Sequence, residues 1–599
     1  MTPIKSALMN NTFLEKYRLV ILTLILIAAA AFRLIGVGWD DNAHLHPDER
    51  FLTMVVTELS WPKNIAEYFQ TQTSPLNPHN KGFSFYVYGT YPTHLVKLTA
   101  QLLEKDMYDD IPIVGRYMST VADLLTLILV YLIAAHLTKN ARAGLLAALC
   151  YATAVLPIQV SHFFTVDPYA TLFATATIYR ITRGKFGLGT GIIMALAIGA
   201  KISMVFLVPV VGCAMLIHAA KHTSLRSVRS WWRLLGTGVV TGISALVTLR
   251  IVYPYVFDGW LLNERVLDNW RQLSSFDGPT TSFPPGIQWI GVHAYQTILD
   301  LLVWGLGAPL GMTAICAVGF YTLRSLYRKQ FQPIFIPVSW ILIVWIYQSL
   351  QFAKPMRYLL PIYPALCVMS GIFLYAVFQR MSRGRLRRYI VMLSLCLLFV
   401  WPLAFSSVYT RQNTRVAAST WIYTHIPEKS IIAWEHWDDP LPFALPTYSP
   451  SMYQQIQLPS FDPDDSEKLG KIGTILSQSD YLVLSSNRAY GALHRADKRF
   501  PIMTRFYTAL FSGSLGFTLA EQFTSRPTIV LPIPAACLHM PGFTYGILSK
   551  PLEKCDGFGV QFVDDYADET FTVYDHPKVL ILRNDRHLSR EQLQKRIYE

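Results

Sequence analysis

Long apolar runs fill residues 19–408 and constrain the fold more than any other feature of this sequence. A helix needs about 20 residues to cross the hydrocarbon core of a bilayer, because each residue adds about 1.5 Å along its axis. Charged residues make up only 15% of the chain, against about 25% in soluble proteins. Apolar runs that approach or exceed the required length occur at 19–38, 112–136, 143–161, 168–182, 186–200, 202–219, 235–253, 297–321, 333–352, 358–378 and 389–408. We therefore expect a polytopic α-helical membrane protein with about eleven transmembrane helices.

The positive charges predict the orientation of these helices. Short cytoplasmic loops of membrane proteins collect Lys and Arg, whereas outer loops hold few. With the N-terminus in the cytoplasm, the short outer turns contain only Lys201, Lys354 and Arg357. The cytoplasmic segments in this arrangement contain Lys5, Lys16, Arg18, Lys139, Arg142, Arg180, Arg183, Lys185, Lys221, Arg226, Arg229, Arg233, Arg324, Arg328, Lys329, Arg380, Arg383, Arg385, Arg387 and Arg388. This asymmetry predicts an N-in, C-out protein of the cell membrane. It also accounts for most of the net charge of +13 without a nucleic-acid partner.

This topology divides the chain into three parts. Residues 1–18 form a cytoplasmic N-terminus, and residues 19–408 form the transmembrane domain with long outer loops at 39–111 and 254–296. Residues 409–599 form an extracytoplasmic α/β domain of ordinary domain size.

The C-terminal domain shows strand patterns and two cysteines. Segments with strand character lie at 481–486, 528–533, 570–575 and 578–583, and the His-Pro pair at 576–577 predicts a hairpin turn between the last two. Cys537 and Cys555 both fall in this domain, and the sequence leaves open whether they pair.

The segment WDDNAHLHPDERF (39–51) places several titratable groups directly after the first apolar run. Asp40 and Asp41 fit a solvated cap at the membrane surface. Pro47 suits the first turn of a helix, and Asp48 and Glu49 then lie near its N-terminus, where the helix dipole favours anions. This segment is therefore either a well-formed helix start or the position of catalytic carboxylates.

Other outer turns carry further charged residues close to the hydrocarbon. His162 and Asp167 lie on one turn, Lys201 on a second, and Lys354 and Arg357 on a third. Helix capping by the acid and snorkelling by the lysines are ordinary alternatives. Together, however, these groups suit the transfer of a group from a lipid-linked phosphate donor, since a carboxylate can accept a hydroxyl proton and cations can bind the departing phosphate.

Two further interpretations concern a metal and sugar stacking. His44, His46, Asp48 and Glu49 are a candidate site for a divalent metal, although this mixture of ligands selects no single ion and no cofactor is firmly predicted. In the C-terminal domain, Glu435 and Trp437 lie in the acidic and aromatic segment WEHWDDPLP, which suits either acceptor-sugar binding or a structural loop.

The chain resembles the membrane-embedded GT-C glycosyltransferases, specifically the bacterial and archaeal relatives of the protein O-mannosyltransferase and aminoarabinose-transferase superfamily. The segments that carry the resemblance are RLIGVGWDDNAHLHPDERF (33–51), SHFFTVDP (161–168) and KPMRYLLPIYPAL (354–366), supported by TRVAASTWIYTHIPEKSIIAWEHWDDPLP (414–442) and ADETFTVYDHPKVLILRN (567–584). A WWDYG-like segment of oligosaccharyltransferases is absent from the sequence, which disfavours en bloc transfer of a large glycan.

The resemblance implies an enzyme that uses a polyprenyl-phosphate sugar, with inversion at the anomeric carbon, on the extracytoplasmic side. It places Asp48 as the acceptor-activating base with Glu49 beside it, Asp167 as a second acid, and Arg357 as the contact to the donor phosphate. Lys201 and Lys354 are further candidates for that contact, and His46 and His162 for weaker contacts to acceptor or sugar. The expected partners are the lipid-linked donor, membrane lipids and a glycan, lipid or protein acceptor. A flippase of lipid-linked sugar and a polysaccharide polymerase or ligase with a lipid-diphosphate donor are the alternatives.

Overall fold

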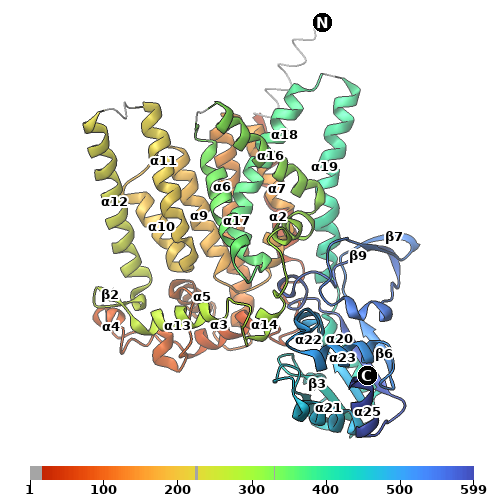
Figure 1. Ribbon diagram of the computed structural model, residues 1–599. Helices are drawn as coiled ribbons and strands as arrows, with labels where there is room; N and C mark the ends of the chain where they lie inside the picture. The colour runs from red at the N-terminus through yellow and green to blue at the C-terminus, as the bar shows by residue number, and fades with distance from the viewer. Residues whose placement is uncertain (1–15, 223–226, 329–330, 383, 599) are drawn as a thin grey trace.

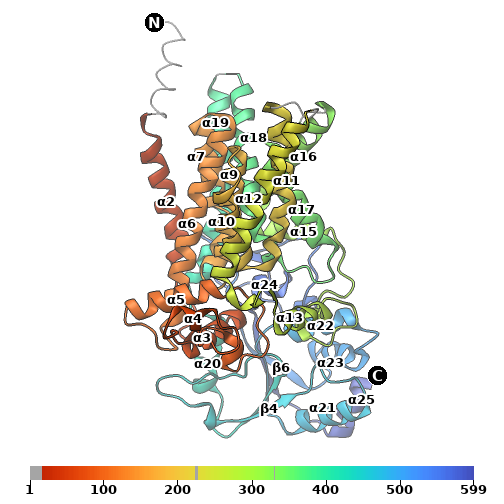
Figure 2. The same ribbon diagram turned by 90° about the vertical axis from the view of Figure 1, so that its left-hand side faces the viewer.

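The computed structural model describes residues 16–222, 227–328, 331–382 and 384–598. A bundle of long helices occupies one end of the molecule, and a mixed α/β region lies beyond the other end of that bundle (Figures 1 and 2). Four predicted cytoplasmic charges, Lys5, Arg226, Lys329 and Arg383, lie outside the described residues, as do most residues of the predicted N-terminal segment 1–18.

A helix lies in each predicted apolar run. The helices of the bundle are α2 (Arg18–Leu34), α6 (Ile111–Thr138), α7 (Ala141–Ala152), α8 (Val155–Ser161), α9 (Asp167–Thr182), α10 (Leu188–Ala200), η2 (Ile202–Phe206), α11 (Leu207–His222), α12 (Val228–Val252), α15 (Gln296–Asp300), η4 (Leu301–Gly305), α16 (Ala308–Arg328), α17 (Phe335–Leu350), η5 (Met356–Ile362), α18 (Tyr363–Arg380) and α19 (Arg385–Ser406). Sequence periodicity and length therefore locate the helices correctly.

Two of the predicted runs are not continuous helices. The run 143–161 is divided into α7 and α8, which are bent by 59° with respect to each other. Pro157 lacks the N–H that a continuous helix would direct at the carbonyl of Thr153. The helix is therefore interrupted near Thr153. The run 297–321 is divided into α15, the π-helix η4 and α16, and Gly307 between the last two has φ +78°, a left-handed conformation that favours glycine.

Length and composition qualify five described helical segments as membrane spans, or six if the bent pair of α7 and α8 counts as one. The five are Ile111–Thr138, Ile202–Lys221, Val228–Val252, Met356–Arg380 and Arg385–His425. The protein is therefore of the helical membrane type with at least five candidate spans, and the larger number of about eleven stays a prediction.

The long predicted outer loops and the C-terminal region share one end of the bundle. The end of α11, the start of α12, the end of α18 and the start of α19 lie at the opposite end (Figure 1). The elements of the first loop are α3 (Pro47–Glu58), α4 (Ile65–Phe69), η1 (Pro78–Lys81) and α5 (Thr90–Leu102). The second loop holds η3 (Pro254–Val256), β1 (Phe257–Asp258), β2 (Leu261–Leu262), α13 (Glu264–Ser275) and α14 (Pro284–Ile287).

The C-terminal region is α/β, as predicted. A five-stranded sheet has the order β4-β3-β5-β10-β6, with parallel pairing of β3 to β4 and β5 and antiparallel pairing of β10 to β5 and β6. A second sheet has the order β7-β9-β8. The strands are β3 (Ile431–Glu435), β4 (Gln454–Leu458), β5 (Tyr481–Leu484), β6 (Phe517–Phe523), β7 (Thr528–Pro534), β8 (Ala536–His539), β9 (Phe558–Val563) and β10 (Val579–Asn584). The helices are η6 (Ser407–Thr410), α20 (Thr414–His425), η7 (Pro450–Met452), α21 (Ser466–Gln478), α22 (Arg488–Leu493), η8 (His494–Ala496), α23 (Pro501–Phe511), η9 (Ile547–Leu552), α24 (Glu569–Thr572) and α25 (Arg590–Tyr598).

The strand predictions for this region are confirmed in three places and wrong in one. Strands β5, β7 and β10 lie where the patterns predict them. The segment 570–575 is not a strand, because the side chain of Asp568 accepts a hydrogen bond from the Thr570 amide and starts the short helix α24 there. The predicted hairpin at 576–577 is therefore also wrong, and β10 pairs with distant strands instead. Cys537 and Cys555 form a disulfide.

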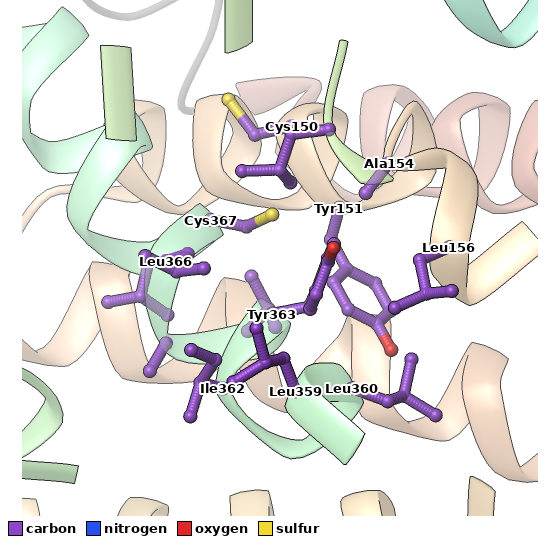
Figure 3. Close-up of a cluster of buried hydrophobic side chains, with 14 of the residues drawn as sticks. Cys150, Tyr151, Ala154, Leu156, Leu359, Leu360, Ile362, Tyr363, Leu366 and Cys367 are labelled. Carbon is purple, nitrogen blue, oxygen red and sulfur yellow. The ribbon is translucent and has the colours of Figure 1, made fainter. Parts of the chain in front are cut away.

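Buried apolar side chains hold η5 and the start of α18 against α7 and α8 (Figure 3). Leu359, Leu360 and Tyr363 are at most 1% exposed, as are Tyr151 and Leu156 on the opposing helices. Between membrane helices, van der Waals packing of such side chains, rather than their removal from water, favours association. This packing fixes the position of the η5 segment, which carries Arg357.

Candidate active site

The first turn of α3 points two neighbouring carboxylates in different directions. His46 caps the helix by accepting a hydrogen bond from the Glu49 amide on Nδ1 at 3.2 Å, and Pro47 is its first residue. Successive residues of a helix are rotated by about 100°, so the side chains of Asp48 and Glu49 diverge. The predicted helix start is confirmed, and it coexists with a distinct environment for each acid.

Asp48 contacts the predicted phosphate-binding arginine. The Arg357 guanidinium donates a hydrogen bond to its Oδ2, and the two side chains are 20% and 19% exposed. Burial alone would raise the pKa of Asp48, but the attraction of Arg357 prevails and holds that pKa below its ordinary value. A hydrogen bond from Tyr88 acts in the same direction. Asp48 is therefore an ionised, partly accessible carboxylate at neutral pH.

Asp167 and Lys201 form a second acid–base pair beside the first. Lys201 Nζ donates to Asp167 Oδ1 at 2.7 Å, and the lysine also lies 4.6 Å from the centre of the Tyr358 ring. The Arg357 guanidinium lies 5.6 Å from the same ring. Tyr358 thus lies close to both cations.

A small pocket is lined by one residue of each pair. Its lining includes Arg357 and Asp167, together with His46, Gln159 and Tyr574. Arg357 and Asp167 are close enough to interact electrostatically. The structure therefore brings Asp48, Asp167, Lys201 and Arg357, which come from four separate outer segments, to one place at the end of the helix bundle.

Glu49 lies outside this cluster, in a closed ion network. Arg116 on α6 donates to Glu49 at 2.5 and 3.0 Å and to Asp40 at 2.9 Å, and the side chains of Arg116 and Glu49 are 0% exposed. Glu49 also accepts a hydrogen bond from the Phe164 amide at 2.6 Å. Asp40 is only 1% exposed, so the prediction that it is a solvated cap is wrong, because its carboxylate pairs with the buried Arg116 instead of water. Asp41 is exposed, as predicted.

The four residues considered for a metal site have four different partners. His44 Nε2 lies 3.0 Å from Asp109 Oδ1, His46 caps α3, Asp48 binds Arg357, and Glu49 binds Arg116. Among the described residues, no group of three or more His, Cys, Asp or Glu side chains is placed to hold a metal ion.

Lys354 and His162 lie close in sequence to residues that line the pocket, but they are not among its lining residues. Lys354 donates to the carbonyls of Gln351 and Phe352 in its own loop, at 2.6 and 3.0 Å. The His162 ring nitrogens contact the carbonyls of Ile158 and Ile35, each at 2.9 Å, and its ring stacks on Tyr409 at 3.7 Å.

Glu435 and Trp437 belong to the C-terminal region and do not line the pocket either. Glu435 is 1% exposed and accepts a hydrogen bond from Tyr507, and burial raises its pKa to about 8. Trp437 is 44% exposed and packs edge-on against Phe283 at 5.6 Å.

The C-terminal region instead supplies Thr570 and Tyr574 to the pocket, which sequence reasoning missed. Their position depends on a buried contact to the bundle, where Gln159 of α8 donates to Asp575 at 3.0 Å and to the Phe571 carbonyl at 2.8 Å. His576 lies between Asp575 and Asp564; burial opposes its charge, yet the two carboxylates raise its pKa to about 10.

Arg116 was also missed, because a single arginine inside an apolar run gives no sign of its partners.

A family model described as dolichyl-phosphate-mannose-protein mannosyltransferase matches residues 97–249. No curated protein matches the chain. Solved structures that are similar to it include the following three. AglB, an archaeal oligosaccharyltransferase from Archaeoglobus fulgidus in complex with an inhibitory peptide and a dolichol-phosphate, has 12% identity and a TM-score of 0.49 over 82% of this chain and 73% of that one. ArnT from Cupriavidus metallidurans bound to undecaprenyl phosphate has 13% identity and a TM-score of 0.42, over 94% and 89%.

The third structure, a protein O-mannosyltransferase complex of S. cerevisiae bound to the sugar donor, has 18% identity and a TM-score of 0.31 over 40% of this chain and 34% of that one. Because these TM-scores are low, we draw no function from them. The family match covers α6 through most of α12, including Asp167 and Lys201. Residues 97–249 are thus mannosyltransferase-like, which confirms the predicted resemblance over this part of the chain.

Proposed function

We propose that this protein is an integral-membrane glycosyltransferase that moves a sugar from a polyprenyl-phosphate donor to an acceptor hydroxyl, with inversion. The observation that carries the proposal is the meeting of Asp48, Arg357, Asp167 and Lys201 at the end of the helix bundle. The mannosyltransferase match to residues 97–249 favours the same class of reaction.

The two cations of the site suit a lipid-linked phosphate. The guanidinium of Arg357 can bind two phosphate oxygens at once, whereas Lys201 acts as a point charge. Both lie at helix ends, where a donor could keep its lipid tail in the membrane while its phosphate enters the pocket. We assign the donor phosphate to these two residues and propose that Asp167 orients Lys201.

Asp48 is the proposed base. Its carboxylate accepts the proton of the acceptor hydroxyl while that oxygen bonds to the anomeric carbon. The bond from the anomeric carbon to the phosphate oxygen breaks, and its electron pair leaves with the polyprenyl phosphate. This single displacement inverts the anomeric carbon. The phosphate is a weak base, so the step requires no general acid.

The contact between Asp48 and Arg357 suggests an order for the two binding steps of the proposed reaction. In the structure the guanidinium is bound to the carboxylate. A donor phosphate that binds Arg357 competes for its N–H groups and leaves Asp48 free to accept a proton. We therefore propose that donor binding precedes activation of the acceptor, which is a glycan, lipid or protein hydroxyl.

The reaction is proposed to take place on the extracytoplasmic face of the cell membrane. The segments rich in Lys and Arg favour an N-in, C-out arrangement, with residues 19–408 as the transmembrane domain and 409–599 as the outer domain. The disulfide between Cys537 and Cys555 supports an oxidising compartment for that domain.

The test is transfer of radiolabelled sugar from polyprenyl-phosphate donors in membranes that contain the wild-type protein, Asp48→Asn or Arg357→Ala. We expect wild-type transfer that both variants lose while expression and folding are retained. Movement of a lipid-linked sugar across vesicles without turnover of any donor would instead identify a flippase. Turnover of lipid-diphosphate donors alone would identify a polymerase or ligase.

A further inference from the structure

A second pocket lies at the end of the helix bundle that faces away from Asp48. It has a volume of about 270 Å³ and is formed by the ends of α6, α16 and α18 and by residues just before α17. The segment η5–α18 connects Arg357 with Tyr375 of this pocket, and its helical rise separates the two sites by about 30 Å. Figure 1 shows the distal ends of α16 and α18 far from α3 and the C-terminal region.

Three arginines concentrate positive charge on this pocket. Arg324 and Arg328 lie one turn apart on α16, and both line it. Arg380, at the end of α18, acts electrostatically on Tyr321, another lining residue, as does Arg324. The pocket has no acidic lining residue, and none of the three arginines forms an ion pair with an acid in the part of the chain that the structure describes.

The rest of the lining combines polar groups with an apolar wall. The side chains of Tyr321, Tyr375, Thr138 and Gln332 supply hydroxyl and amide groups. Ile372, which is 3% exposed, contributes apolar surface between them. A ligand that satisfies this lining has an anionic head with several acceptor oxygens and an apolar part beside it.

We propose that this pocket binds the phosphate headgroup of an anionic membrane lipid. Guanidinium groups pair with phosphate oxygens in a fixed geometry, and basic pockets between transmembrane helices are a recurring form of lipid-headgroup site. Arginines in cytoplasmic loops also orient a membrane protein in the bilayer. That role requires neither a cavity beside the arginines nor a common contact such as Tyr321. The site is separate from the proposed active site, and its occupation does not depend on the proposed reaction.

Native mass spectrometry of the delipidated full-length protein tests this proposal, with phosphatidylglycerol and phosphatidylcholine as the added lipids. We expect preferential retention of phosphatidylglycerol by the wild type, weakened roughly tenfold or more in Arg324→Gln/Arg328→Gln. The matched control is Arg387→Gln/Arg388→Gln, which removes the same charge from the start of α19, outside the pocket lining. Equal loss in both variants, or no preference for the anionic lipid, would overturn the proposal.

Inorganic phosphate forms the second arm of the experiment. If millimolar phosphate leaves the bound lipid in place, the source of the phosphate group is the membrane, as proposed. If phosphate displaces the lipid from the wild type and binds with the same dependence on Arg324 and Arg328, the pocket is a site for soluble phosphate, and the lipid assignment is wrong. A melting temperature close to that of the wild type shows that the exposed arginines are not needed for folding.

Discussion

Asp48 and Glu49 are adjacent acids in the same helical turn, yet they belong to different regions of the molecule. Asp48 contacts Arg357 at the edge of a pocket, where both side chains remain about one-fifth exposed. Glu49 contacts Arg116 where both are fully enclosed. An accessible ion pair can exchange partners with a substrate, whereas an enclosed pair cannot do so without breaking the fold. Accessibility, rather than residue type, therefore separates the proposed chemistry from the framework that holds it.

The enclosed network links the parts that the accessible cluster needs. Through Glu49, Arg116 connects the start of α3 with the Phe164 amide, three residues before Asp167. Asp48 lies on one side of this connection and Asp167 on the other. We therefore expect the enclosed network to set the distance between the two accessible pairs.

The largest expected effect is the loss of stability caused by Glu49→Gln. Glu49→Gln leaves the Arg116 charge partly uncompensated in the interior, and loss of one partner of a buried ion pair costs about 3–5 kcal/mol. Thermal unfolding in detergent should show a strongly lowered melting temperature. Glu58→Gln is the matched control, since Glu58 lies on the same helix and is exposed. A variant Glu49→Gln as stable as Glu58→Gln would show that the enclosed network is not structural.

A second prediction concerns donor binding by the two lysines near the cluster. Lys201→Met should raise the KM for the lipid-linked donor roughly 10- to 100-fold, because a hydrogen bond to a charged group is worth about 1.5–3 kcal/mol. Lys354→Met should leave that KM nearly unchanged, since Lys354 donates only to loop carbonyls. Steady-state kinetics over a range of donor concentrations distinguishes the two. Equal effects of the two substitutions would contradict the assignment of Lys201.

A third prediction uses Glu435, a buried carboxylate for which the structure shows a tyrosine partner and no cation. Burial raises its pKa from 4.5 to about 8, so the folded state binds a proton that the unfolded state releases between these values. Stability should therefore fall as the pH rises through this window, by up to about 1.4 kcal/mol per pH unit. Glu435→Gln should remove this part of the pH dependence. The measurement is the melting temperature of both proteins between pH 5 and 8, and identical slopes would argue against a protonated Glu435.

The sequence predicts the helical content well and singles out the residues that meet at the candidate site, for a physical reason. Apolar runs and charge-poor outer turns are local properties, so they locate the helices. Asp167, Lys201 and Arg357 stand out against apolar neighbours, and Asp48 lies in the titratable segment that follows the first apolar run. The helix interruptions near Pro157 and Gly307 also have local causes, but hydrophobicity alone does not reveal them, because both residues lie within apolar runs.

The remaining features depend on contacts between distant segments. The partners of Arg116 lie in the first loop, and Tyr574 reaches the pocket only because the C-terminal region docks on α8 through Asp575. The predicted strand at 570–575 failed for a related reason, since the capping side chain of Asp568 decides the local structure there.

The most direct test of the account is the rate of sugar transfer in a single turnover by purified, folded Asp48→Asn with donor already bound. The account predicts a chemical step about 10²–10⁴-fold slower than in the wild type, with donor affinity retained because Arg357 is free to bind the phosphate. Asp48→Asn that transfers sugar within a few fold of the wild-type rate would contradict the assignment of Asp48 as the base.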